Sequence, residues 1–195
     1  MNKKTVEDNR LYRFNITIQV IKMENKLPIR KKNRLLNHDY SSCGVYFITI
    51  CTQEKKCLFW SQEQPNFVGE DIILPPDYVQ LSPYGKYVEE AIQAIPRHYP
   101  HIELLQYVIM PNHVHLIAFI PDTSGRILSS PTKTSSLSIA IGQMKRSVSK
   151  KIGEPIWQRS FHDHIIRDYK DYEKIAKYIY ENPIKWQDDC FYSKS

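Results

Sequence analysis

Short segments rich in apolar residues, many of them β-branched or aromatic, occur at four places in the chain and are typical of β-strands. The predicted strands are residues 45–52, 103–110, 113–120 and 161–167. Pro111 and Asn112 separate the second run from the third, and such a pair is typical of a tight turn. We therefore expect the second and third strands to pair as an antiparallel hairpin.

Apolar residues repeat at helical spacing in three further segments. The first begins at Ser82, a residue type that caps helices, and Pro96 is expected to stop it. The second spans residues 136–152, and the third runs from near Lys170 to just before Pro183. The resulting order is strand, helix, strand, strand, helix, strand, helix. It predicts an α+β fold of the ferredoxin-like, split βαβ type: a central antiparallel sheet, two helices on one face and an added C-terminal helix.

The length of 195 residues is enough for one domain with its own core. We expect an N-terminal extension over residues 1–29, in which Met23 is an alternative start. A basic arm over 30–40 and a core over about 41–186 would then make up a single domain, 30–195. No apolar run is long enough to span a membrane, and no secretory signal follows the N-terminus.

The net charge of +6 is confined to the first 40 residues. It is densest at Arg30, Lys31, Lys32 and Arg34, which are candidate DNA-binding residues. A basic arm on a neutral domain favours a polyanionic partner, although a solubilising tail explains the charge equally well.

Four cysteines occur without a CxxC pair, at positions 43, 51, 57 and 190. This spacing indicates reduced thiols in a cytoplasmic protein rather than disulfides or a zinc site.

His113 and His115 flank Val114 on a predicted strand. Residues two apart point to the same face, so the two imidazoles would stand side by side and could chelate one divalent metal ion. The alternative is a pair of polar residues on an exposed hairpin face. The rest of that strand is apolar, and polar groups in such a place need partners or a function.

Tyr178 and Asn182 lie four apart on the last predicted helix and share one flank, which is offset from its apolar stripe. A tyrosine oxygen can attack a phosphodiester, and the Asn182 carbonyl oxygen could complete the shell of a hard metal ion. The alternative is an ordinary tyrosine, since the chain has 13 of them.

Six short segments occur in an order that is typical of one family. They are residues 39–42 (DYSS), 45–49 (VYFIT), 108–115 (VIMPNHVH), 156–161 (IWQRSF), 163–167 (DHIIR) and 178–183 (YIYENP). This set resembles the REP-associated tyrosine transposases, which belong to the HUH single-strand DNA transposases of bacterial insertion sequences. The resemblance covers about residues 30–186 and leaves 1–29 without a counterpart.

The resemblance implies roles for particular residues. His113 and His115 match the pair that binds Mg²⁺ or Mn²⁺, Tyr178 matches the nucleophile, and Asn182 matches the third metal-side residue. Relatives from insertion sequences usually carry Gln at that last position, and Asn182 followed by Pro183 favours the REP-associated branch. The family cleaves single-stranded DNA beside a hairpin, forms a 5′-phosphotyrosine, and acts as a monomer or a homodimer.

Several other residues carry weaker signals. His164 is expected to be a buried structural histidine, and Trp157 and Trp186 to be packing residues. Three basic residues of the second helix are expected to face solvent: Lys145, Arg146 and Lys150.

The sequence thus predicts a metal-dependent, single-strand DNA transposase and endonuclease. Two other functions stay open: a hairpin-DNA-binding regulator derived from a transposase, and a metal hydrolase of small phosphate esters. Steep salt dependence of DNA binding would argue against the hydrolase, because counterions are released when a protein binds the phosphate backbone.

Overall fold

The structure is a computed structural model that describes residues 43–61, 79–121 and 136–192. The predicted extension, the basic arm and the four arm residues Arg30, Lys31, Lys32 and Arg34 lie outside the described residues. The strands are β1 (Gly44–Cys51), β2 (Glu103–Ile109), β3 (His113–Ile120) and β4 (His162–Ile166). The helices are α2 (Pro83–Gln93), α3 (Ile95–His98), α4 (Ser136–Ile152) and α5 (Tyr169–Glu181), with short 3-10 turns η1 (Gln53–Lys55) and η3 (Trp186–Asp188).

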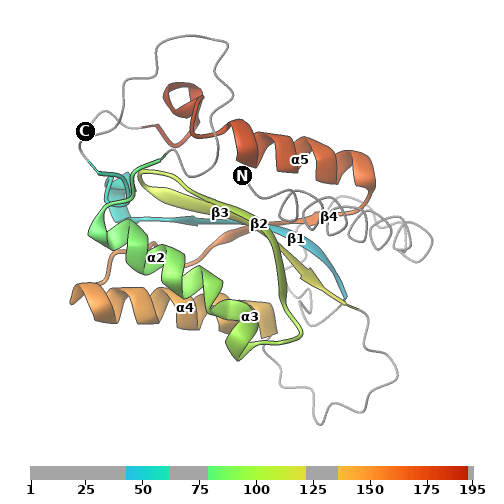
Figure 1. Ribbon diagram of the computed structural model, residues 1–195, viewed down its shortest axis with the longest axis horizontal. Coiled ribbons are helices and arrows are strands. Elements are labelled where there is room, and N and C mark those ends of the chain that lie inside the picture. The colour runs from blue at the N-terminus through green and yellow to red at the C-terminus, as the bar shows by residue number, and fades with distance from the viewer. Residues whose placement is uncertain (1–42, 62–78, 122–135, 193–195) are drawn as a thin grey trace, which may run out of the picture.

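The four strands form one sheet in the order β2-β3-β1-β4 (Figure 1). Every neighbouring pair is antiparallel, and β3 pairs along its length with β1 on one side and β2 on the other. This is the order of a split βαβ fold, because β3 lies between β1 and β2, and β4 joins the sheet at the other side of β1. The predicted α+β class and sheet are confirmed.

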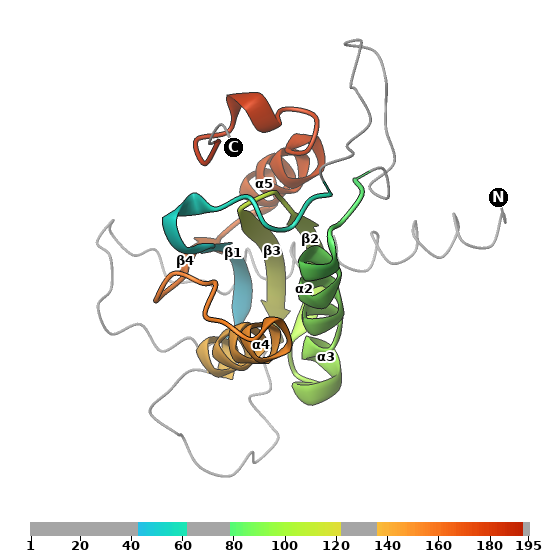
Figure 2. The ribbon, with the colours of Figure 1, turned by 90° about the vertical axis from the view of Figure 1, so that its left-hand side faces the viewer.

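The two faces of the sheet are covered differently, as Figures 1 and 2 show. Helices α2 and α4 pack on one face, where they bury the larger core cluster, including Val114. Helix α5 lies on the other face, where Ile175 and Ile179 pack against a smaller cluster that includes Val45 and Ile117. The prediction of two helices on one face and a separate C-terminal helix is confirmed.

Local capping signals set the ends of the helices. The Ser82 hydroxyl accepts a hydrogen bond from the Gly85 amide and caps α2, as predicted. Helix α2 ends earlier than expected, at Gln93, and Pro96 lies in the first turn of α3, where its missing N–H costs nothing. Asp168 caps α5 through the Asp171 amide.

All four cysteines are free thiols. Within the described ranges, no helix is long and apolar enough to cross a membrane.

Candidate metal centre and nucleophile

His113 and His115, here called the histidine pair, begin strand β3 on the face that α5 covers. Both side chains are essentially inaccessible, with relative exposures of 0% and 1%. Val114 between them points into the opposite core, as the alternation of a strand requires. The alternative of two exposed polar residues on a hairpin is therefore wrong.

Each imidazole of the pair is oriented by a neighbour through its Nδ1 atom. His113 Nδ1 lies 2.9 Å from Asn112 Oδ1, and His115 Nδ1 lies 2.8 Å from Thr49 Oγ1. The Asn112 amide group donates to the backbone carbonyls of Lys55 and Phe191, which turns its oxygen toward the imidazole. His113 therefore donates from Nδ1 and keeps a lone pair on Nε2.

The two Nε2 atoms of the pair face each other at 3.0 Å. Two ligands in adjacent positions of an octahedral shell, each about 2.1 Å from the ion, would be about 3.0 Å apart. Burial lowers the pKa of His113 to about 4. Burial and the neighbouring His113 lower the pKa of His115 to about 3. Both rings are therefore neutral at pH 7, which is the form that binds a metal ion.

Tyr178 reaches the histidine pair from α5. Its hydroxyl lies 3.2 Å from His115 Nε2 and donates to Asp189 Oδ2 at 3.0 Å. The Phe47 ring stacks on His115 and meets the Tyr178 ring edge-on. Burial, followed by the negative charge of Asp189, raises the pKa of Tyr178 well above its usual value, so the hydroxyl is protonated at rest. The side chain is nevertheless 39% exposed, so an external substrate can reach it.

Asn182 lies one turn beyond Tyr178 and points to the same place. Its amide nitrogen donates to Asp189 Oδ2 at 2.9 Å. Its carbonyl oxygen is buried without a hydrogen-bond partner among the residues that the structure describes. A buried carbonyl oxygen left unpaired is costly, and a cation would satisfy it. The residues present therefore fit a metal ion.

Asp189 is the residue of this site that the sequence analysis missed. One ligand atom from each of His113, His115 and Asp189 lies within 4.8 Å of the others, so the three form a candidate metal site. Burial raises the pKa of Asp189, but hydrogen bonds from the Phe191 amide and from Asn182 outweigh it and hold the carboxyl ionised. Only the turn η3 decides that Asp189, and not its neighbour Asp188, faces the pair.

The two tryptophans that the sequence analysis assigned to packing both contact other aromatic rings. Trp157 is a core residue packed on Phe59, as predicted, whereas Trp186 packs on Trp60 and also approaches the His113 ring at 6.0 Å.

The prediction of a buried structural His164 is wrong. Its side chain is 54% exposed, and Nε2 lies 2.8 Å from Asp171 Oδ2. Strand β4 is an edge strand, and His164 lies near the start of α5, where that helix does not bury it. Lys145 also differs from expectation, since it is half-buried and donates to the carbonyls of Gln158 and Ser160. Arg146 and Lys150 are exposed, as expected.

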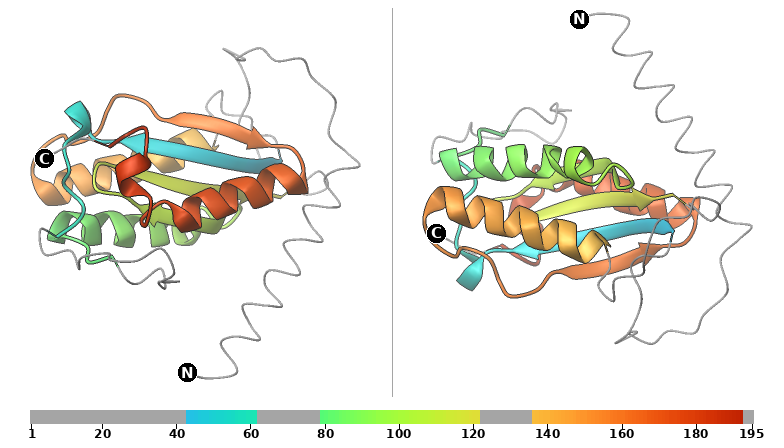
Figure 3. Two further views of the ribbon diagram at one scale, coloured as in Figure 1. Left: turned by 90° about the horizontal axis from the view of Figure 1, so that it is seen from above. Right: turned by 90° about the horizontal axis from the view of Figure 1, so that it is seen from below.

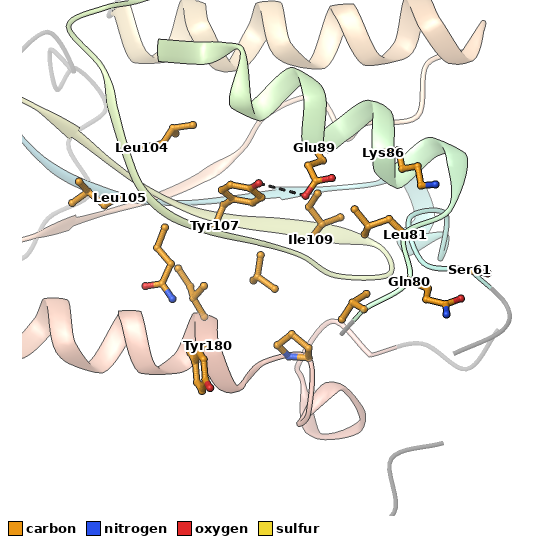
Figure 4. Close-up of a pocket in the computed structure, with 15 residues that line it drawn as sticks. Ser61, Gln80, Leu81, Lys86, Glu89, Leu104, Leu105, Tyr107, Ile109 and Tyr180 are labelled. Carbon is orange, nitrogen blue, oxygen red and sulfur yellow. Dashed lines mark hydrogen bonds between the residues drawn. The ribbon is translucent and has the colours of Figure 1, made fainter. Parts of the chain in front are cut away.

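Two hollows flank α5. A small one, about 250 Å³, is lined by Tyr178, Asn182 and Asp189 together with lysines of the same helix. A larger groove, about 840 Å³, follows β2 on the other side of the helix, where Tyr180 faces it (Figure 4). Tyr107 in this groove is hydrogen-bonded to Glu89 at 3.5 Å. Tyr178 and Tyr180 therefore belong to different surfaces.

Comparisons with known proteins place these features in a family. The model of a family described as "Transposase IS200 like" matches residues 79–182, which include the histidine pair, Tyr178 and Asn182. An uncharacterized protein of Haemophilus influenzae is 35% identical over 179 residues, covering 84% of this chain and 93% of that protein. A second protein of the same organism, provisionally named a REP-associated tyrosine transposase, is 29% identical over 75% of this chain and 74% of its own length. A solved structure of a REP-associated tyrosine transposase bound to a REP hairpin has a TM-score of 0.49 and 23% identity, covering 80% of this chain and 74% of that one.

Proposed function

Because the chain belongs to the IS200-like transposase family, we propose that it cleaves and rejoins single-stranded DNA through a covalent tyrosine intermediate. The observation that carries this proposal is the 3.2 Å approach of the Tyr178 hydroxyl to His115 Nε2. A hydroxyl nucleophile beside a candidate metal centre is the arrangement that transesterification of a phosphodiester needs.

The proposed metal ligands are the two Nε2 atoms of the histidine pair, the Asn182 carbonyl oxygen and the Asp189 carboxylate. Two nitrogen and two oxygen donors suit a six-coordinate divalent ion that keeps positions for substrate oxygens, and we propose Mg²⁺ or Mn²⁺. When bound, the ion would draw charge from the scissile phosphate and favour the ionised form of the tyrosine.

The chain's own groups perform the remaining steps of the proposed reaction. Tyr178 Oη attacks the phosphorus, and the P–O3′ bond breaks. The phenol proton passes to Asp189, the acceptor to which the hydroxyl already donates. The 3′ oxygen leaves with the electron pair of that bond and takes up a proton from solvent, so the products are a 5′-phosphotyrosine and a free 3′-OH. The ester keeps the energy of the cleaved bond, so a 3′-OH can reverse the step and rejoin the strands without ATP.

We also propose that the DNA carries a hairpin beside the cleaved strand and that the basic arm contacts its backbone. Arg30, Lys31, Lys32 and Arg34 supply four positive charges in five residues, and phosphate contacts of this kind give affinity without sequence readout. The resemblance to the family supports action as a monomer or a homodimer.

A denaturing gel tests the proposal. The protein is incubated with labelled single-stranded hairpin DNA from the flanks of its gene, once with Mn²⁺ and once with EDTA. We expect a metal-dependent, protease-sensitive shifted band that is absent in Tyr178→Phe and in His113→Ala. The matched control is Tyr180→Phe, two residues away on the other flank of α5, which should retain the band.

The same experiment separates the rival functions. A native complex with no covalent band in the unsubstituted protein would favour the hairpin-binding regulator. Hydrolysis of small phosphate esters with neither a complex nor a band would favour the hydrolase. A covalent band that persists in Tyr178→Phe would show that another residue is the nucleophile.

A further inference from the structure

Strand β4 carries two histidines on the same face of the sheet as the histidine pair. Thr49 of β1 lies opposite His115 on one side and opposite His162 on the other. Residues opposed in antiparallel strands share a face, and the hydrogen bond between Thr49 and His115 fixes which face it is. His115, Thr49 and His162 thus form one row across three strands, and two strand spacings separate its ends by about 10 Å.

A second row lies beside the first. Phe47 of β1 is opposite His164, whose imidazole contacts Asp171 of α5. The half-buried Phe47 ring also contacts the rings of His115 and Tyr178, with centroids 5.1 and 6.3 Å away. Together the two rows form a continuous surface from the nucleophile to the edge of the sheet. Figure 3 (left) shows that α5 leaves β4 and much of β1 in view along this path.

Lys174 adds a positive charge to this surface. It lies three residues after Asp171 and four before Tyr178, on the flank of α5 that these residues share. It lines the small hollow at Tyr178. The other lysines there, Lys177 and Lys185, are both paired with Glu181, whereas Lys174 has no ion pair within the described part of the chain.

We propose that Phe47, His162, His164 and Lys174, here called the β4 strip, bind the single-stranded DNA that continues from the phosphate attacked by Tyr178. This inference rests on the proposed function and adds a path for the strand. Lys174 and His162 would contact backbone phosphates, and Phe47 would stack against an unpaired base, a contact that tolerates any sequence. The groove along β2 is a poorer path, because its lining includes the acidic Glu89 as well as Lys86, so the charge of the lysine is offset (Figure 4).

The test compares two DNA probes in a Tyr178→Phe background, which prevents covalent capture. One probe is the hairpin with its single-stranded extension, and the other is the same hairpin without the extension. Binding is measured by fluorescence anisotropy with Mn²⁺ at several salt concentrations. The variants are His162→Ala and Lys174→Gln, and the controls are His98→Ala on α3 and Lys150→Gln on α4, both exposed and on elements away from this face.

We expect each strip variant to weaken binding of the extended probe by about three- to tenfold, as the loss of one polar contact does, with no change for the bare hairpin. Lys174→Gln should also reduce the slope of log K against log salt by about 0.7, the value for one phosphate contact on a single strand. Both controls should leave both probes unchanged.

Two results would overturn the inference. One is equal weakening for both probes, which would indicate general attraction. The other is unchanged binding of the extended probe in every strip variant, while the unsubstituted protein still forms the covalent band. The proposed function would then stand, and the single strand would follow another path over the protein. If the unsubstituted protein forms no band and binds neither probe, the proposed function and this inference both fail.

Discussion

Replacing Thr49 by valine tests whether the orientation of His115 determines metal binding. Valine keeps the shape and the β-branched stem of threonine and removes only the hydroxyl that faces His115 Nδ1 at 2.8 Å. Both residues are buried, with exposures of 6% and 1%, so water cannot replace the lost partner. An unpaired buried donor costs about 1–3 kcal/mol in the free energy of unfolding.

The larger consequence concerns which nitrogen of His115 carries the proton. With Thr49 as acceptor, Nδ1 holds the proton and Nε2 offers its lone pair toward the other imidazole. Without the hydroxyl, the proton can occupy Nε2 instead and compete with the metal ion. Loss of such an orienting partner typically lowers metal affinity by about 10–100-fold, or about 1.4–2.8 kcal/mol.

Titration calorimetry with Mn²⁺ measures this loss directly, with urea unfolding as a parallel measurement of stability. Thr49→Ser restores a hydroxyl and should recover most of the affinity. Thr52→Val removes another buried hydroxyl, which bonds to the carbonyls of Lys56 and Asn112 and to neither imidazole. It should reduce stability with little effect on Mn²⁺ affinity. Equal Mn²⁺ affinity in Thr49→Val and the unsubstituted protein would refute the reasoning.

Three further predictions address the carboxylate, the packing of α2 and the effect of pH. Asp189→Asn should lower Mn²⁺ affinity at least tenfold in the same titration, whereas Asp188→Asn, its exposed neighbour, should not. Gly85→Ala would place Cβ 2.2 Å from the carbonyl oxygen of Phe59 and should reduce stability in urea by about 1–3 kcal/mol, whereas Gly142→Ala meets nothing within 4 Å and should leave it equal or higher. The histidine pair has folded pKa values of about 4 and 3, below the unfolded value of 6.5, so the unfolded chain binds more protons in this window. Stability should therefore be full above pH 6.5 and fall as the pH drops toward 4, and a flat urea midpoint over that range would contradict the burial argument.

Signals local to the chain account for the parts of the fold that the sequence predicted well. Strand β3 and helix α4 have the predicted bounds. Strand β3 is an apolar segment that follows the turn residues Pro111 and Asn112, and α4 shows helical periodicity and ends before Gly153. The convergence of the histidine pair with Tyr178 and Asn182 could also be expected. Spacing on a strand and on a helix puts each pair on one face, and the resemblance brings the two faces together.

What the sequence could not predict depends on contacts between distant segments. Asp189 reaches the site because the chain turns back through η3, and the side chain is then held by Tyr178 and Asn182. Nothing in two adjacent aspartates tells which one faces inward. The exposure of His164 depends likewise on where α5 crosses the sheet, which is set by the packing of Ile175 and Ile179.

The two halves of the candidate site have opposite physical requirements, and the fold meets them with different elements. The histidine pair must stay neutral to bind a cation, and burial on a central strand whose other face is core achieves this. The proposed nucleophile, Tyr178, must instead meet a large external substrate, and it lies on a surface helix that leaves it partly exposed. Asp189 links the histidine pair to Tyr178, since it accepts a hydrogen bond from the tyrosine hydroxyl and lies within ligand distance of the imidazoles. A change at Asp189 should therefore alter metal binding and the state of the tyrosine together, whereas a change at Thr49 acts on the metal half first.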